Sequence, residues 1–472
     1  MFENFLNSDD FEKSQERAEQ AALWFEERLK DGRHFFMDSF QIHQALSYYF
    51  SKQDFLKALQ LMEYALLLFP NNADFWYKKA IIYLELQNLE QALECIEWAI
   101  QNESTEIEYQ LFKFKVLTYN AQYTEALETL HQALYLAEDP LPVIFQLGNF
   151  FQHQEKYEEA IYYYKQLLAL DETYTQAITE LCLCYEFLND YTGATNFLKE
   201  LIEQHPQLAQ GYYHLAILYH KLGLYELAIE QIEIVKILEP SYLAAYHLAA
   251  GAFMDLGKYD RALVQLVEAL WLEPDNYLSL LMAGECYEML ELFDTAFRYY
   301  QKCAHRYPDI YEAWLGMGSV MVNQGNYALA LPFLKKSIEI YEESFDAWLH
   351  LAECEYYLGN PGAAMQAFLR AQSIEPQEYG VWQEWGERFV EEGNLSGAIT
   401  FLQQGIERNP TKVELYYQCA AYLFLDKQEE DALTLLENAL LLGFEKHGLL
   451  YHYAPKLKKH TLVQMLIEQY QQ

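Results

Sequence analysis

Apolar residues recur along this chain with spacings of three and four residues, which is the pattern of one face of an α-helix. One such series is Trp314, Met317, Gly318 and Met321, and another is Tyr259, Ala262, Leu266 and Ala269. The two kinds of series alternate along the sequence. The pattern therefore predicts an all-α chain whose helices come in pairs.

The paired pattern returns every 34 residues. The segment LGLYELAIEQIEIVKILEPSY at 222–242 is followed at 256–276 by LGKYDRALVQLVEALWLEPDN. Steps of 34 residues in both directions from Ala262 meet alanine every time, at Ala58, Ala92, Ala126, Ala160, Ala194, Ala228, Ala262, Ala296, Ala330, Ala364, Ala398 and Ala432. With this alanine at repeat position 20, twelve repeats run from Ser39 to Lys446 without insertion or deletion. Such a period predicts stacked helical units, because each unit can bury its apolar face only against the next copy.

Two columns of the repeat carry residues that end helices. Position 32 holds Pro70, Pro206, Pro240, Pro274, Pro308, Pro376 and Pro410, and proline stops a helix that arrives from upstream. Position 15 holds Gly223, Gly257, Gly325, Gly359 and Gly393, with Asn189 in a further repeat. Glycine or asparagine is typical of a left-handed helix C-cap. Each repeat is therefore predicted to be a hairpin of two helices.

This pattern resembles the tetratricopeptide repeat, whose 34-residue signature places Trp, Leu, Gly, Tyr, Ala, Phe, Ala and Pro at positions 4, 7, 8, 11, 20, 24, 27 and 32. The repeat that fits best is 209–242, with Tyr212, Leu215, Ala216, Tyr219, Ala228, Ile232, Val235 and Pro240 at these positions. The repeat 107–140 departs most, with Lys113 and Phe114 in place of Leu and Gly, and we expect an altered packing angle there. The resemblance implies a right-handed superhelical solenoid of antiparallel helix hairpins.

Solenoid ends need caps with a polar outer face. We expect residues 1–38 to form an N-terminal capping helix that begins near Asp9, with Glu12 completing a capping box. Its apolar stripe is Phe11, Ala18, Ala22, Phe25 and Leu29. We expect residues 447–472 to form a C-terminal capping helix over Thr461–Tyr470, whose inward face is Leu462, Met465, Leu466 and Tyr470.

The composition of the chain limits the classes of partner that we expect it to bind. The formal net charge is −38, and such a chain is repelled by phosphate backbones and anionic lipid surfaces. The start of the chain has no signal-peptide pattern, no stretch is long and apolar enough to span a bilayer, and the seven cysteines are spread along the array. We expect a cytoplasmic protein that binds proteins or peptides with basic or apolar segments, with no nucleic acid and no membrane insertion. The oligomeric state stays open, since the solenoid ends or outward tyrosines such as Tyr162 could pair copies.

Candidate chemistry is sparse. Cys182 and Cys184 are one residue short of the usual metal or redox spacing, and position 8 of the repeat favours a small buried thiol at Cys182. His214 and His220 are six residues apart, whereas two imidazoles on one metal are typically four apart on a helix. No Gly-rich phosphate loop or nucleophile elbow occurs. We expect neither enzymatic activity nor a cofactor or metal, and we interpret the basic KLKK at 456–459 as a solvated loop.

The resemblance implies that positions 2, 5, 9 and 12 of each first helix face a concave groove. Early and middle repeats place there Phe40, His43, Phe50, Tyr77, Ile81, Leu84, Leu111, Phe145, Tyr213 and His247. Later repeats place there Glu285, Glu288, Glu312, Asp346, Glu353, Tyr356 and Glu387, with Glu384 one position over. Exposed aromatic groups are typical of interfaces, and carboxylates attract Lys- or Arg-rich segments. The Lys and Asn clamp that some family members use for terminal carboxylates is missing, since Phe145 replaces Lys before Asn149.

The favoured hypothesis is a non-enzymatic scaffold or adaptor that holds partner segments in this groove. The alternative is a peptide-responsive signalling regulator whose superhelix changes pitch on binding. The third hypothesis is an enzyme whose active site lies in the groove. The groove columns are assigned by analogy, and the other interpretation of them is an ordinary solvated surface of an acidic solenoid.

Overall fold

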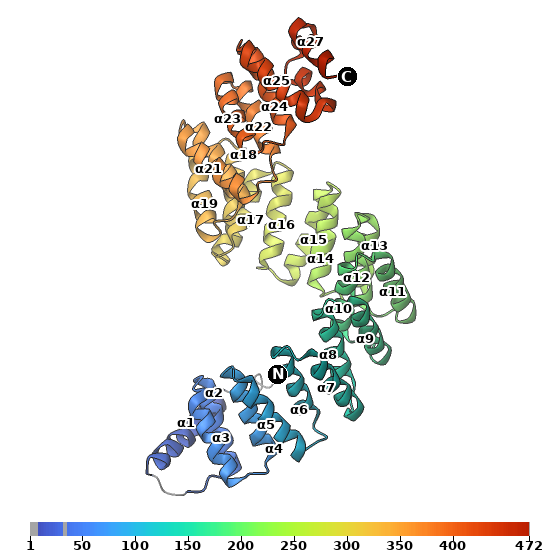
Figure 1. The fold of residues 1–472 in the computed structure, drawn as a ribbon, viewed down its shortest axis with the longest axis vertical. Helices are drawn as coiled ribbons and strands as arrows, with labels where there is room; N and C mark the ends of the chain where they lie inside the picture. The colour runs from blue at the N-terminus through green and yellow to red at the C-terminus, as the bar shows by residue number, and fades with distance from the viewer. Residues whose placement is uncertain (1–7, 32–34, 472) are drawn as a thin grey trace. The chain divides into compact units, whose positions relative to one another are not determined.

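The computed structural model describes residues 8–31 and 35–471, and within these ranges it contains helices and no strand (Figure 1). The chain divides into two compact units, Met1–Ala245 and Tyr246–Gln472, which are described separately. The predicted all-α class is confirmed.

In the first unit one helix precedes six hairpins. These helices are α1 (Ser8–Asp31), α2 (Ser39–Ser51), α3 (Phe55–Leu68), α4 (Ala73–Glu85), α5 (Leu89–Asn102), α6 (Ile107–Tyr119), α7 (Tyr123–Leu136), α8 (Leu141–His153), α9 (Tyr157–Leu170), α10 (Thr175–Phe187), α11 (Tyr191–Gln204), α12 (Ala209–Lys221) and α13 (Tyr225–Leu238). Helix α14 (Leu243–Asp255) contains the boundary between the two units.

The second unit continues with the same alternation. Its helices are α15 (Tyr259–Leu272), α16 (Tyr277–Met289), α17 (Phe293–Arg306), α18 (Tyr311–Asn323), α19 (Tyr327–Ile340), α20 (Phe345–Tyr357), α21 (Pro361–Ile374), α22 (Gly380–Glu391), α23 (Leu395–Arg408), α24 (Val413–Leu425), α25 (Glu429–Gly443), α26 (Gly448–Tyr453) and α27 (Thr461–Tyr470). Two short 3-10 helices, Phe444–Lys446 and Pro455–Lys459, flank α26.

The helix bounds repeat with the 34-residue period. From Ser39 on, the first helix of each hairpin, here called the A helix, begins at repeat position 1, except that α22 begins at position 2. Every A helix ends at position 13. The second, or B, helix begins at position 17 and ends at position 30, or at 31 in α25. The predicted hairpins are thus confirmed in each unit.

Position 15 has a left-handed backbone in all twelve repeats. The five predicted glycines have φ between +68° and +80°, and Asn189 has φ +54°. Six further residues share this conformation, namely Gln53, Gln87, Ala121, Glu155, Glu291 and Lys427. Such a backbone costs a residue with a side chain about 1–2 kcal/mol. The turn geometry of the hairpin therefore dictates the conformation even where the residue type opposes it.

The aromatic residue at position 4 and the proline at position 32 are joined by one hydrogen bond. Trp314 Nε1 donates to the carbonyl of Pro308 at 2.9 Å, and Trp76 Nε1 donates to that of Pro70 at 2.8 Å. Tyr416 makes the same bond to Pro410 through its hydroxyl at 3.0 Å. Because the bond links one repeat to the connection before it, the two signature positions act as one contact.

This contact is replaced where α22 begins late. Trp382 at position 4 is fully buried and donates to the Gln372 side-chain oxygen at 2.9 Å. Gln372 in turn donates from Nε2 to the carbonyl of Glu378 at 3.0 Å. The altered connection before α22 is thus held by a glutamine that bridges indole and backbone.

Small residues lie where the two helices of a hairpin approach closely. All twelve alanines at position 20 are buried. A Cβ atom added to Gly284, at position 8, would lie 2.6 Å from the Tyr300 ring at position 24. Repeats with tyrosine at position 24 therefore need glycine at position 8.

The repeat 107–140 has ordinary helix bounds despite its unusual residues. Phe114 is buried and packs edge-on against Phe150, with ring centroids 5.9 Å apart. Lys113 Nζ is 2.8 Å from Glu97 Oε1. Both substitutions thus make contacts with neighbouring repeats in place of the usual small-residue packing.

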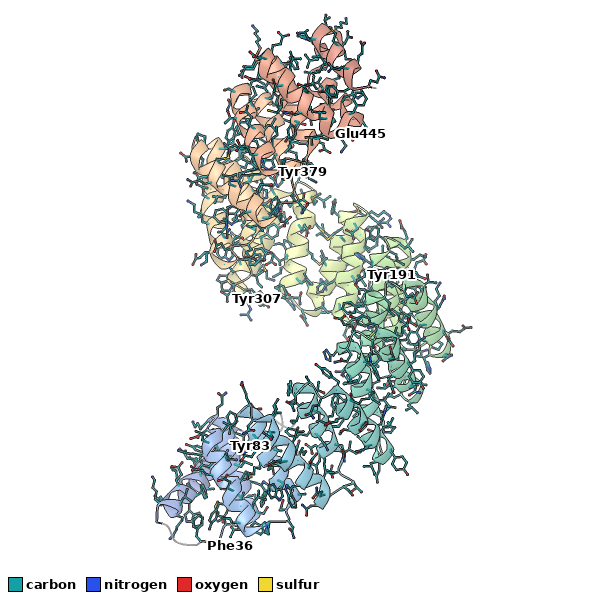
Figure 2. All side chains as sticks on the ribbon, in the orientation of Figure 1. Phe36, Tyr83, Tyr191, Tyr307, Tyr379 and Glu445 are labelled. Atoms are coloured by element: carbon teal, nitrogen blue, oxygen red, sulfur yellow. The ribbon has the colours of Figure 1, made fainter. Side chains whose placement is uncertain are left out.

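Many tyrosines of the repeat serve packing, as predicted. At position 11, Tyr49, Tyr185 and Tyr219 are buried. Tyr83 at position 11 and Tyr191 at position 17, both labelled in Figure 2, are half-buried. Their burial shows that these tyrosines belong to the packing of the repeats.

Helix α1 caps the first repeat through apolar and polar contacts. Ala18, Ala22 and Phe25 are buried as expected, whereas Leu29 is 44% exposed, so its assignment to the stripe was wrong. The predicted Phe11 contact and the capping box of Asp9 and Glu12 lie outside the described side chains.

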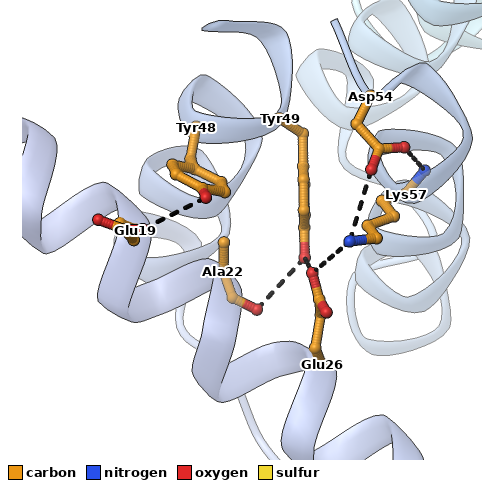
Figure 3. A network of polar contacts seen from close by, with 7 residues as sticks. All are labelled: Glu19, Ala22, Glu26, Tyr48, Tyr49, Asp54 and Lys57. Carbon is orange, nitrogen blue, oxygen red and sulfur yellow. Dashed lines mark hydrogen bonds and ion pairs between the residues drawn. The ribbon is translucent and has the colours of Figure 1, made fainter. Parts of the chain in front are cut away.

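Figure 3 shows the polar part of this contact. The Tyr49 hydroxyl donates to the Ala22 carbonyl at 3.2 Å and contacts Glu26 Oε1 at 3.3 Å. Lys57 Nζ is 2.9 Å from the same Glu26 oxygen. One carboxylate of α1 therefore joins the first two helices of the array.

The C-terminal helix α27 packs through a face that matches the prediction in part. Leu466 and Tyr470 are half-buried and pack against the core as predicted, whereas Leu462 and Met465 are 47% and 61% exposed, so their assignment was wrong. The buried pair is Val463 and Ile467, four residues apart on the helix. The KLKK segment, expected as a loop, forms the 3-10 helix Pro455–Lys459, which buries Leu457.

Candidate functional site

The candidate binding surface consists of positions 2, 5, 9 and 12 of the A helices together with Glu384; we call it the A face. In the first unit, Phe145 and Tyr213 are partly covered by the tyrosine that ends their own repeat at position 34. Tyr213 packs edge-on against Tyr242 with centroids 4.8 Å apart, and Phe145 contacts Tyr174 at 5.3 Å. Leu111 is half-buried, and Phe40 is 67% exposed.

Tyr77 is held in the same way. Its ring lies 5.0 Å from that of Tyr109, and its hydroxyl donates to Glu108 Oε1 at 3.0 Å. Burial, followed by the Glu108 carboxylate, raises the pKa of Tyr77. This tyrosine therefore stays neutral and offers a ring edge as contact surface.

Polar groups of the A face join adjacent repeats through contacts between residues 35 apart. Lys78 Nζ is 2.8 Å from His43 Nδ1, and Thr179 Oγ1 is 3.1 Å from His214 Nε2. In the second unit the same offset places Asn323 Nδ2 2.9 Å from Glu288 Oε1. The offset follows from a repeat of 34 plus one position along the neighbouring helix.

These contacts occupy two of the carboxylates that the sequence assigned to the groove. Glu288 accepts hydrogen bonds from Tyr300 at 3.0 Å, Ser319 at 2.6 Å and Asn323 at 2.9 Å. A carboxylate that accepts three such bonds has little capacity left for a ligand.

Glu353 is similarly engaged. Its side chain is 18% exposed and lies 2.7 Å from Arg388 Nη1. Burial alone would raise the pKa of Glu353, but the neighbouring His350 and Arg388 outweigh it and lower the pKa. Glu353 is therefore a charged partner of Arg388 and is largely shielded from solvent, whereas the Arg388 side chain is 38% exposed.

Six carboxylates of the A face are exposed, namely Glu108, Glu285, Glu312, Asp346, Glu384 and Glu387. Partial desolvation, followed by the Glu288 and Asp255 carboxylates, raises the pKa of Glu285. A cation from a partner would relieve this repulsion.

Two further predicted residues are bonded to neighbours. His247 Nε2 lies 2.7 Å from the Ser279 hydroxyl, and burial lowers the pKa of this histidine. Tyr356 donates its hydroxyl to Glu392 Oε2 at 2.6 Å, and its ring lies edge-on to Phe389 at 4.9 Å.

The predicted sulfur and imidazole pairs have environments of structural groups. Burial raises the pKa of Cys182 and of Cys184 to about 12, which keeps both thiols protonated. Burial lowers the pKa of His214 to about 4. Among the described residues, no group of three or more His, Cys, Asp or Glu side chains is placed to hold a metal ion.

Over the described part of the chain, none of the helices combines the length and the apolar character that a membrane span requires.

The repeat pattern did not predict a pocket that lies among α20, α21, α22 and α23. Its walls include Tyr356, Phe368, Trp385, Phe389 and Phe401, and its volume is about 330 Å³. The one local signal is at position 17, where Pro361 stands in place of the usual Tyr, Phe or Leu.

Comparison with known proteins points to one repeat family. Four family models described as tetratricopeptide repeat match residues 46–110, then 151–211 and 321–383, then 278–309, and then 209–233. Together these matches cover about half of the chain. A search of curated protein sequences finds no match.

Solved structures that are similar to segments of this chain include the following three. YrrB, a TPR protein with an unusual peptide-binding site, is 23% identical over 38% of this chain and 92% of its own, with a TM-score of 0.32. MamA is 18% identical over 35% of this chain and 96% of its own, with a TM-score of 0.32. A tetratricopeptide repeat protein from Parabacteroides merdae ATCC 43184 is 15% identical over 50% of this chain and 93% of its own, with a TM-score of 0.41.

Proposed function

We propose that this chain, which belongs to the tetratricopeptide repeat family, is a non-enzymatic scaffold that binds partner segments along the A face of its helix hairpins. Repeats of this family are protein interaction modules in general. The finer statement, that the A face is the binding surface and that its partners carry basic or apolar segments, is the proposal.

The exposed carboxylates of the second unit carry this proposal. Neighbouring repeats engage Glu288 and Glu353, whereas Glu384 and Glu387 point out of α22 one turn apart and are exposed. Two exposed carboxylates separated by three residues lie on the same helix face. They would attract a Lys- or Arg-rich segment and accelerate its capture.

The aromatic part of the A face supports binding of apolar segments in the first unit. Phe40 is 67% exposed, and Tyr77, Phe145 and Tyr213 are held in fixed orientations by ring contacts. Rigid, half-exposed aromatic rings lose little entropy on binding and are enriched at interfaces.

Charge reversal tests the proposal. The chain would be purified from its own cells after mild crosslinking, as wild type and as Glu384→Lys/Glu387→Lys. A matched control, Glu375→Lys/Glu407→Lys, makes the same change of charge at two exposed residues outside the A face. We expect partners to be lost from the A-face variant and kept by the control. Equal retention of partners by both variants would contradict the assignment of the A face.

A further inference from the structure

The pocket in the second unit lies at the junction of the repeats 345–378 and 379–412. Met365 and Phe368 of α21 form one side, Trp385 and Phe389 of α22 form another, and Phe401 of α23 closes the floor. Phe368, Trp385 and Phe401 belong to the buried core, with the Phe368 and Phe401 rings 4.7 Å apart. The walls are therefore rigid and strongly aromatic.

Polar groups surround the opening. Exposed Asn394, Ser396 and Thr400 belong to the lining. The Tyr356 hydroxyl, also in the lining, donates to the Glu392 carboxylate at 2.6 Å. An aromatic cavity of about 330 Å³ with a few polar groups has the size and character of a small ligand site.

The junction lacks a ring that most other repeats supply. Eight of the twelve repeats have Tyr or Phe at position 17, and in two junctions this ring stacks on a ring at position 13 of the next repeat, Tyr327 on Tyr357 at 4.4 Å and Tyr157 on Phe187 at 5.0 Å. In this junction the two positions hold Pro361 and Glu391, so neither supplies a ring.

The charge around the pocket indicates which residues would flank a group bound in it. Helices α20 to α23 and their connections, residues 345–408, contain ten Asp or Glu residues against three Arg and no Lys. Two of the acidic groups, Glu355 and Glu392, accept hydrogen bonds from Asn360 and Tyr356 at the ends of the pocket-forming helices. A ligand that carries lysine or arginine next to the group bound in the pocket would therefore meet complementary charge.

We propose that this pocket binds an aromatic side chain of a partner protein, flanked in the partner's sequence by Lys or Arg. The inserted ring takes the place that the chain's own position-17 tyrosine fills in other junctions. The site goes beyond the A face, with which it shares only Tyr356, and it is a second, independent point of attachment.

Three variants of the full chain isolate the pocket. Thr400→Trp fills it from an exposed position, and Pro361→Tyr restores the ring of the repeat pattern. Thr434→Trp is the matched control, since Thr434 occupies the same repeat position and is also exposed. Both threonine hydroxyls donate at 3.0 Å to the carbonyl four residues earlier, Ser396 and Glu430.

The probe is the fluorescein-labelled peptide Gly-Lys-Lys-Gly-Trp-Gly-Lys-Lys-Gly. Its binding is measured by fluorescence anisotropy at about 150 mM salt, which limits nonspecific electrostatic attraction. Two comparison peptides replace Trp by Ala, or all four Lys by Glu. We expect the Trp peptide to bind at least about tenfold more tightly than the Ala peptide, as for a ring that fills a buried anchor pocket. The Glu peptide should not bind. Thr400→Trp and Pro361→Tyr should remove the preference for Trp, and Thr434→Trp should keep it.

Several results would overturn the proposal. They are equal binding of the Trp and Ala peptides, a Trp preference that survives both pocket variants, or no saturable binding up to about 1 mM. Light scattering that shows a wild-type dimer dissociated by Thr400→Trp would identify a second copy of the chain as the occupant instead. The Glu384→Lys/Glu387→Lys variant separates the two proposals: it should retain the Trp preference even if it loses A-face partners.

Discussion

Replacing Ala121 by glycine is expected to stabilise the protein, although glycine normally weakens helical proteins. Ala121 is exposed and has φ +57° at position 15, between α6 and α7. Its backbone is fixed by the bonds Ala121 N–H to Thr118 O at 3.1 Å and Gln122 N–H to Leu117 O at 2.9 Å. No side-chain packing of consequence is therefore lost with the methyl group.

The expected change in the free energy of unfolding is the difference between two opposing contributions. Relief of the left-handed conformation contributes about 1–2 kcal/mol, and the greater entropy of glycine in the unfolded chain costs about 0.5–1 kcal/mol. The net expectation is a gain of about 0.5–1 kcal/mol. The matched control is Ala169→Gly, at an exposed site within α9, which should cost up to about 1 kcal/mol.

Native-state hydrogen exchange of the amides in α6 and α7 measures the effect, because stability in a repeat array is local. Slower exchange in Ala121→Gly and faster exchange of α9 amides in Ala169→Gly would agree with the reasoning. Faster exchange around position 121 after the substitution would refute it, since glycine would then act there as in an ordinary helix.

Three further predictions concern contacts between repeats. Trp314→Phe removes the hydrogen bond to the Pro308 carbonyl and should lower the free energy of unfolding, measured by urea denaturation, by about 1–2 kcal/mol. The control Trp271→Phe, at a residue that is 84% exposed, should change this free energy little. Gly284→Ala should lower the free energy of unfolding by about 1–3 kcal/mol, because the new Cβ atom would clash with the Tyr300 ring. The double variant Gly284→Ala/Tyr300→Leu should lose less stability than the sum of the two single variants, and additive losses would exclude the clash. The lowered pKa of Glu353 means that its charge stabilises the second unit above pH 4.5 and that this contribution is lost as the pH falls through the folded-state pKa. Urea midpoints between about pH 3 and 7 should therefore fall less steeply with acid in Glu353→Gln than in wild type, and parallel curves would contradict this.

Much of the fold was predictable because one period governs the sequence. The alanine column at position 20 and the prolines at position 32 place the helix ends, and the observed A and B helices begin and end at constant repeat positions. Residue types alone did not reveal the left-handed backbone at Gln87 or Glu291, because the hairpin geometry overrides their preference. The inward face of α27 was predicted only in part: Leu466 and Tyr470 pack against the core, but its buried residues are Val463 and Ile467, which join a cluster with Leu450 and Leu457.

The candidate site was less predictable, since it depends on contacts between repeats. The columns identified Glu288 and Glu353, but their partners Asn323 and Arg388 are 35 residues away, and the offset requires the register of neighbouring helices. The pocket lies beside Pro361, which lacks the aromatic ring that most repeats have at position 17. The missing ring indicates a pocket only once the positions of the surrounding side chains are known.

Site-specific photo-crosslinking tests the central proposal, binding along the A face, most directly. A photoreactive residue would be placed at Phe40 and Glu387 on the A face, and at Tyr135 and Trp271, which are 90% and 84% exposed on B helices. Binding along the A face predicts crosslinks to partner proteins in cells from the first two positions and none from the other two. Crosslinks confined to Tyr135 and Trp271 would contradict it and assign binding to the B helices.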